Sequence, residues 1–330
     1  MSKYEAIHGI KIRDYTTDPD TLVDGQLWFD KTNKVLQFQE TNAAGTFATG
    51  GDLNNATADS AGWGTQTSAV KALGGTTDNP VPGKETELYN GSAWTEVNDS
   101  NLARFSLGGK GVNSTSGLVW GGYGTGGSSP VRAETEVWNG TNWTEVNDLN
   151  AVRNGPGSAG IATAALTFGG AGTTNGYTEL WNGTNWTEVG DINTARNTGA
   201  GFGVTNTAAV YCGEASSVNG ITELWNGTSW TEVNDLNTTR RQHGMSAGAG
   251  SSISGMVFGG ENPSASNIAN VETFNGTSWS AFAPLNVARK GGIGAGASNA
   301  SGLFAGGNDD NDATEEYTSP AIAVKTVDID

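Results

Sequence analysis

The chain has 330 residues, in which 17 lysines and arginines face 34 aspartates and glutamates, so its formal net charge is -17. This charge argues against a nucleic-acid backbone or an anionic membrane as a partner, because both carry the same sign. The 50 glycines, the 11 tryptophans and the low charged fraction of 15% indicate short strands and turns around aromatic rings.

Cys212 is the only cysteine, so no disulfide can form within the chain and the fold must depend on packing. The N-terminal residues carry charges where a secretory signal would have its apolar segment. No stretch approaches the ~18 apolar residues of a membrane span. We therefore expect a soluble protein without a signal peptide or membrane insertion.

The first segment, residues 1–40, does not belong to the repeat that follows. Residues 24–38 alternate between apolar and polar side chains on either side of Asp30–Asn33, which is typical of a β-hairpin. The run Gly25-Gln26-Leu27-Trp28-Phe29 resembles attachment segments in bacteriophage tail fibres and other virion proteins. The resemblance implies that residues 1–40 anchor the chain, with three aromatic anchor side chains: Trp28, Phe29 and Phe38.

An aromatic residue followed by a turn then recurs at intervals of 43 to 49 residues. These aromatics are Tyr89, Trp138, Trp181, Trp225, Phe274 and, in a weaker copy, Tyr317. Asn-Gly follows each of the first five, and a tryptophan lies five residues after each: Trp94, Trp143, Trp186, Trp230 and Trp279. Asn-Gly between alternating apolar segments predicts a tight hairpin, since both residues tolerate the positive φ that such a turn needs.

Two more strands are predicted upstream of each hairpin. One ends in a glycine pair, and a Gly- and Ala-rich stretch such as residues 199–204 precedes it. The pairs are Gly74-Gly75, Gly121-Gly122, Gly169-Gly170, Gly259-Gly260 and Gly306-Gly307, and the fourth copy departs as Gly213-Glu214. We attribute the glycines to close backbone approach near a crowded axis. Each unit thus supplies four strands.

A connector of the form Asp-Leu-Asn-x-x-Arg joins each unit to the next. Its arginines are Arg104, Arg153, Arg196, Arg240 and Arg289, and the first copy has Thr57 instead. A glutamate lies two residues before each hairpin aromatic: Glu87, Glu136, Glu179, Glu223, Glu272 and Glu315. The glycine pair, glutamate, aromatic hairpin, tryptophan and arginine together resemble the kelch repeat over residues 46–318. The resemblance implies an all-β fold, a six-bladed kelch-like β-propeller that follows the N-terminal β-hairpin anchor segment.

The domain prediction follows from how the ring would close. The last unit ends after Tyr317 without a tryptophan strand, and a strand around Phe47 precedes the first connector without a blade of its own. We expect the Phe47 strand to complete the sixth blade, because closure removes exposed edges. Residues 1–40 are then the attachment segment, residues 41–318 the propeller and residues 319–330 a C-terminal tail.

The recurring arginines and glutamates have two interpretations. They can form ion pairs between blades, or they can form a ring for catalysis or ligand binding. Repetition favours the structural interpretation, since a group needed once for chemistry is not expected in every blade.

We predict no metal site, no cofactor and no catalytic residues. Only His8, His243 and Cys212 are available as soft ligands, which is too few for an ordinary zinc or copper site. Residues 308–313, around Asp310, offer oxygen ligands for Ca²⁺ but lack the glycine and the distal glutamate of an EF-hand. A solvated loop is the default interpretation there.

Loops that vary in length between the units are candidates for recognition. The two longest are residues 123–133 and 261–270, with Tyr123, Arg132, Asn262 and Asn267 as candidate contact residues. Tolerated drift in loop length explains the same pattern.

These features favour a bacteriophage virion protein, located in the particle, that binds other virion proteins through residues 1–40 in several copies and displays its propeller towards a host-surface glycan. It is not expected to be an enzyme. The alternatives are a free carbohydrate-binding lectin-like propeller and, third, a propeller enzyme acting on glycans.

Overall fold

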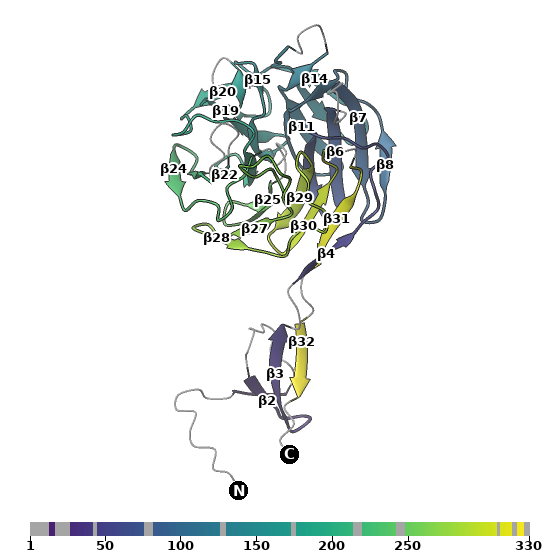
Figure 1. The fold of residues 1–330 in the computed structure, drawn as a ribbon, viewed down its shortest axis with the longest axis vertical. Coiled ribbons are helices and arrows are strands. Elements are labelled where there is room, and N and C mark those ends of the chain that lie inside the picture. The colour runs from purple at the N-terminus through teal and green to yellow at the C-terminus, as the bar shows by residue number, and fades with distance from the viewer. Residues whose placement is uncertain are drawn as a thin grey trace. The chain divides into compact units, whose positions relative to one another are not determined.

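The computed structural model describes residues 13–16, 27–41, 45–75, 82–125, 130–172, 176–213, 220–241, 248–308, 311–318 and 322–326. These residues form strands, turns and loops, and no helix among them is long and apolar enough to cross a membrane. The chain divides into two compact units (Figure 1). Unit 1 comprises Met1–Thr46 and Ser319–Asp330, and unit 2 comprises Phe47–Thr318.

The described residues of unit 1 form one four-stranded sheet. In spatial order its strands are β1 (Arg13–Tyr15), β2 (Leu27–Asp30), β3 (Val35–Thr41) and β32 (Ile322–Thr326). The turn between β2 and β3 is held by Asp30, whose carboxylate accepts hydrogen bonds from Thr32 N at 2.8 Å and from Asn33 Nδ2 at 2.7 Å. The bonds from the Asn33 side chain and main chain lower the pKa of Asp30.

The predicted C-terminal tail is not separate from the N-terminal segment. Strand β32, from within residues 319–330, pairs antiparallel with β3, so that Ala323 lies opposite Glu40. The two segments that flank unit 2 in sequence therefore share one sheet. A short tail of this kind contains too few residues to reveal a strand by alternation alone, which is why the sequence did not indicate the pairing.

Unit 2 is an all-β, propeller-like fold. Its described residues form six four-stranded sheets. Each sheet takes its strands in the order of the chain, apart from the last, which takes its outer strand from the start of the unit. In spatial order, the first two sheets are β5 (Ala61–Thr65), β6 (Ser68–Gly75), β7 (Pro82–Tyr89) and β8 (Trp94–Val97), and β10 (Gly108–Asn113), β11 (Ser116–Trp120), β13 (Thr135–Trp138) and β14 (Trp143–Val146). The next two are β16 (Gly157–Ile161), β17 (Ala164–Phe168), β19 (Thr178–Trp181) and β20 (Trp186–Val189), and β21 (Ala200–Thr205), β22 (Ala208–Cys212), β23 (Thr222–Trp225) and β24 (Trp230–Val233). The last two are β25 (Gly248–Ser251), β26 (Ser254–Phe258), β27 (Val271–Phe274) and β28 (Trp279–Ala281), and β29 (Ile293–Ser298), β30 (Ser301–Ala305), β31 (Thr314–Thr318) and β4 (Thr46–Thr49).

The first strands of these sheets lie next to one another in the order β5, β10, β16, β21, β25 and β29, and β29 also contacts β5. Figure 1 shows the sheets of unit 2 arranged about a common centre. Two short ribbons lie outside the sheets, where β9 (Arg104–Phe105) pairs with β12 (Tyr123–Gly124) and β15 (Arg153–Asn154) pairs with β18 (Ala171–Gly172).

The predicted hairpins are present, each with a four-residue loop in which the asparagine of Asn-Gly does not adopt a positive φ. Trp138 and Trp143 face each other across β13 and β14, so residues 139–142 form the loop. Gly140 has a positive φ of 90°, whereas Asn139 is not among the positive-φ residues. The Asn139 side chain instead accepts hydrogen bonds from the main-chain N–H groups of Thr141 and Asn142, each at 2.9 Å. Asparagine therefore serves as an acceptor here, not as a residue of unusual backbone conformation.

The apolar core lies between neighbouring sheets, because each hydrophobic cluster draws side chains from two of them. Leu118 and Trp120 pack against Trp181 and Trp186 of the following sheet. Paired aromatic rings contribute to this contact, as where the ring centroids of Trp120 and Trp186 lie 5.1 Å apart.

Candidate functional site

Five buried arginine–glutamate pairs occupy the connectors. They join Arg104 to Glu136 at 2.8 Å, Arg153 to Glu179 at 2.5 Å, Arg196 to Glu223, Arg240 to Glu272 at 2.6 Å and Arg289 to Glu315 at 3.0 Å. In the second repeat, the other oxygen of Glu136 accepts hydrogen bonds from Asn101 N and Asn101 Nδ2, both at 2.8 Å. Both carboxylate oxygens of Glu136 therefore have hydrogen-bond partners, and this glutamate holds its connector in place.

The predicted pairing between blades needs a correction. Each pair lies within one repeat, since the arginine precedes the sheet that contains its glutamate. The arginine joins two sheets by a different route, through its main chain. Arg153 O accepts a hydrogen bond from Gly122 N of the preceding sheet at 2.8 Å, while its guanidinium binds Glu179 of the following one.

The same contact explains the glycine pair, which does not lie at the central axis as expected. A Cβ on Gly121, whose φ is +66°, would lie 2.6 Å from Arg153 O. A Cβ on Gly169 would likewise lie 2.5 Å from Arg196 O. Glycine is required because the next connector passes directly over the end of the strand.

The first repeat lacks an arginine and uses Lys71 of β6 instead. Lys71 Nζ lies 3.9 Å from Glu87 Oε1, and both side chains are buried. Burial lowers the pKa of Lys71, and the charge of Glu87 opposes that shift. Sequence reasoning missed Lys71 because it lies on a strand and not in the connector, so the repeat alignment gives it no partner.

Neighbouring sheets are joined by tryptophan–threonine hydrogen bonds that the sequence analysis also missed. Each indole N–H donates to a threonine hydroxyl of the preceding sheet at 2.8 to 3.1 Å: Trp94 to Thr314, Trp143 to Thr86, Trp186 to Thr135, Trp230 to Thr178 and Trp279 to Thr222. A signal existed, because the threonine always stands immediately before the recurring glutamate.

The candidate contact loops are held by their own residues. The Tyr123 ring stacks on Phe105 at 5.2 Å, and Arg132 pairs with Glu134 at 3.2 Å. Asn262 Oδ1 accepts hydrogen bonds from the N–H groups of Ser264 and Ser266, and Asn267 forms an isolated bridge with Glu261. These contacts hold the loops, and a role of the four residues in recognition stays a prediction. Residues 126–129 of the first loop lie outside the described residues.

Glu261, at the base of the second loop, is buried and forms an ionic cluster with two partly exposed cations. It binds Arg241, with Nη2 2.5 Å from Oε1, and it also binds Lys290. Although burial alone raises the pKa of Glu261, the hydrogen bonds from Lys290 and Arg241 lower it below its ordinary value. The repeat pattern did not reveal this cluster, because its residues belong to no recurring motif.

The described residues contain no group of three or more His, Cys, Asp or Glu side chains that could hold a metal ion. His8, His243, Asp309 and Asp310 lie outside them. At the edge of the proposed calcium loop, Asn311 Oδ1 accepts hydrogen bonds from Arg289 Nη1 and Ala313 N, each at 3.0 Å. Burial raises the pKa of the Cys212 thiol to about 12, so this cysteine is not a reactive thiolate.

Among the predicted anchor residues, Trp28 is fully buried. Its ring is therefore packed in the interior, and its assignment as an anchor residue stays a prediction. Phe29 is half-buried, and the neighbouring Leu27 is 39% exposed. Phe38 lies on β3, opposite Leu27, and its side chain is outside the described part.

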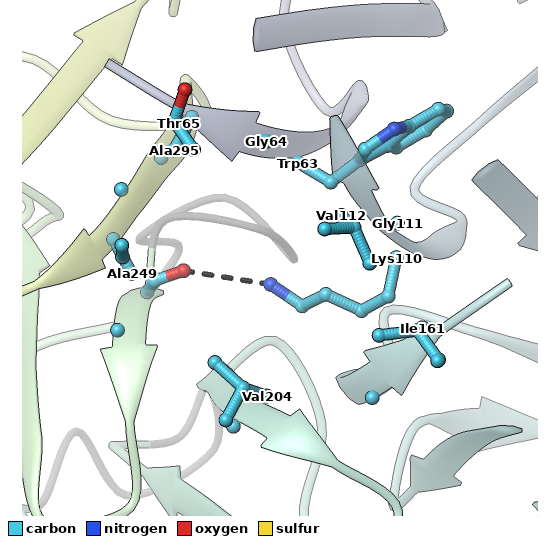
Figure 2. Close-up of a pocket in the computed structure, with 17 residues that line it drawn as sticks. Trp63, Gly64, Thr65, Lys110, Gly111, Val112, Ile161, Val204, Ala249 and Ala295 are labelled. Carbon is cyan, nitrogen blue, oxygen red and sulfur yellow. Dashed lines mark hydrogen bonds between the residues drawn. The ribbon is translucent and has the colours of Figure 1, made fainter. Parts of the chain in front are cut away.

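A cavity of about 250 Å³ lies at the centre of unit 2, between the C-terminal parts of the first strands. Its walls are glycine, alanine and a few larger side chains: Trp63, Thr65, Val112, Ile161 and Val204. Lys110 of β10 extends across it, with Nζ 3.5 Å from Gly248 O of β25 (Figure 2). Burial lowers the pKa of Lys110 to about 8.

The cavity lies at the opposite ends of the strands from the connectors and from the two long loops. The first strands begin next to the connectors and end at the cavity, and in an antiparallel sheet the loops between second and third strands return to the connector end. The sequence did not indicate Lys110, because no other repeat has a lysine on its innermost strand. Comparison of the chain with models of known protein families and with curated proteins gives no match.

Proposed function

We propose that unit 2 is a closed, six-bladed kelch-like β-propeller that works as a structural and binding module without catalytic activity, and that the chain is a bacteriophage virion protein attached through unit 1. Closure is supported by the strand order, because β4 is the neighbour of β31 and β29 contacts β5. Asn286 Nδ2 also donates to Phe47 O at 3.0 Å, where Asn101 and Asn150 donate to the main-chain carbonyl oxygens of Trp143 and Trp186.

Closure is also supported at the one place where the tryptophan–threonine pair of the other repeats is replaced by two apolar residues. Phe47 occupies the position of the outer-strand tryptophan, and its ring has no N–H to donate. The residue opposite it in the preceding sheet is Val271, where the other repeats have threonine, and the two belong to one apolar cluster. A threonine there would leave a buried hydroxyl unpaired, so the two apolar residues fit each other.

This exchange gives a double-mutant test of closure. Phe47→Trp and Val271→Thr are each expected to lower the free energy of unfolding by about 1–3 kcal/mol, since each introduces one buried unpaired polar group. The double variant is expected to recover about 1 kcal/mol or more of the summed loss by forming the sixth tryptophan–threonine bond. Urea denaturation measures the coupling. Strictly additive losses would show that the two residues do not meet.

The anchoring role rests on one observation, the shared sheet of β1, β2, β3 and β32. Both segments that flank unit 2 are gathered into a single small unit, which suits an attachment module that is distinct from a displayed domain. The occupied glutamates and the protonated, buried Cys212 support a role without catalysis.

The virion role is tested with purified phage particles and peptide mass spectrometry. Peptides of the chain are expected in the particles, and Leu27→Asp with Phe29→Asp is expected to reduce incorporation strongly by placing charges on unit 1. Val287→Asp, at a position of unit 2 that is 47% exposed, is the matched control and should incorporate normally. Absence of the chain from particles would reject the proposal.

A free carbohydrate-binding propeller is the second candidate, and the central cavity favours it. In that case, binding of a ligand to unit 2 would not depend on Leu27 or Phe29, and the chain would be missing from particles. The two candidates therefore predict opposite results in the same experiment.

A further inference from the structure

Lys110 is a buried cation without a carboxylate partner. The residue is 6% exposed, and among the described residues that line the cavity it is the one ionisable group. The other buried cations described above differ, since Arg153 pairs with Glu179 and Lys71 lies near Glu87. An unpaired charge in an apolar site lowers the stability of the fold. Its presence at the centre of unit 2 therefore points to a ligand that supplies the missing anion.

The ammonium group of Lys110 has more N–H donors than acceptors around it. A lysine carries three N–H donors, and the one acceptor that the structure gives to Lys110 is Gly248 O, at the long distance of 3.5 Å. Figure 2 shows the side chain spanning the cavity, with Ile161 and Val204 on the neighbouring strands. Val112 and Val204 are each 52% exposed, so the cavity opens to solvent past apolar side chains.

We propose that this cavity binds a small monocarboxylate, whose oxygens accept hydrogen bonds from Lys110 Nζ and whose apolar part packs against Ile161 and Val204. The volume of about 250 Å³ suits a short-chain acid or a single uronic acid residue. One cation in a chain of net charge -17 favours a monoanion over a dianion. The proposed binding site follows from the cavity and Lys110, and it does not depend on the proposed virion role.

Isothermal titration calorimetry on the full chain at pH 7, in a buffer without carboxylates, tests the site. Sodium propionate is compared with propionamide, and sodium glucuronate with glucose, so that each acid has a neutral counterpart. We expect at least tenfold tighter binding of one acid than of its counterpart. Glucuronate alone would identify a glycan terminus as the source, and propionate alone would identify a free short-chain acid.

Two variants assign the binding to Lys110 and to the cavity. Lys110→Met keeps the length of the side chain and removes the charge, and it is expected to weaken binding of the acid at least tenfold. Ile161→Trp keeps the charge but fills the cavity, and it should also abolish binding. Lys84→Met, at a lysine whose side chain is 52% exposed, is the matched control and should bind like the wild type.

The proposal fails if neither acid binds to the wild type, if the neutral counterparts bind as tightly, or if Lys110→Met binds unchanged. Thermal melting checks that each variant is folded. Should Lys110→Met not fold, Ile161→Trp still decides, since unchanged binding in that variant would place the ligand elsewhere.

Discussion

Replacement of Arg153 by methionine is expected to lower the free energy of unfolding of unit 2 by about 3–5 kcal/mol. Methionine retains much of the apolar stem but removes the guanidinium that binds Glu179 Oε1 at 2.5 Å, Tyr177 O at 2.8 Å and Gly169 O at 3.2 Å. The loss is large because Glu179 is 1% exposed and would keep a charge in the interior without its cationic partner.

Arg132 provides the matched control for this prediction. It forms a comparable ion pair with Glu134, but the two side chains are 26% and 28% exposed. Because solvent screens such a pair, Arg132→Met is expected to change the free energy of unfolding by about 1 kcal/mol or less. Urea denaturation of both variants at pH 7 measures the difference. Equal effects at the two positions would mean that the buried pairs do not hold the connectors.

The second large effect concerns pH. Burial lowers the pKa of Lys110 from 10.5 to about 8 in the folded chain. Between these two values the unfolded chain binds the extra proton, so the free energy of unfolding rises with pH across this window. The shift corresponds to about 3 kcal/mol, and below pH 8 it acts as a constant destabilisation.

Lys110→Met is expected to remove this dependence. The variant should be more stable than the wild type by about 3 kcal/mol at pH 7, and the difference should shrink towards zero by about pH 10.5. The pKa of Cys212 is raised in the folded chain, so this group lowers the free energy of unfolding as pH increases, and the shifted pKa of Lys71 also makes stability depend on pH. Both groups are present in the wild type and in the variant, so their contributions cancel in the comparison. Urea midpoints at pH 7, 8, 9 and 10 provide the measurement. Parallel curves for the two proteins would contradict a depressed pKa at this site.

Much of unit 2 could be predicted because the residues that form its strands and turns recur in every repeat. The recurring aromatics and their period-two alternation predicted antiparallel four-stranded sheets, and the structure contains them. The arginines and glutamates were expected as ion pairs, and five pairs form. Their placement within one repeat was missed, since a repeated sequence gives the same spacing for a partner in the same unit or in the next.

The candidate site could not be predicted for the opposite reason. Lys110 occurs once, and its neighbours come from strands as distant in sequence as β5 and β29. Only the arrangement of six inner strands shows that one lysine crosses a cavity and meets no carboxylate there. Likewise, Asn139 appeared to be a turn residue by conformation, whereas the structure shows that its side chain forms the turn by accepting two hydrogen bonds.

The position of β4 has a consequence for synthesis. Phe47 packs against Tyr317, with ring centroids 5.6 Å apart, although about 270 residues separate them along the chain. Ribosomes add roughly 5–20 residues per second, so β4 waits on the order of 15 to 50 seconds before β31 emerges. During that interval the nascent chain has an incomplete last sheet and an uncovered strand edge, which makes it a natural client for chaperones until translation ends.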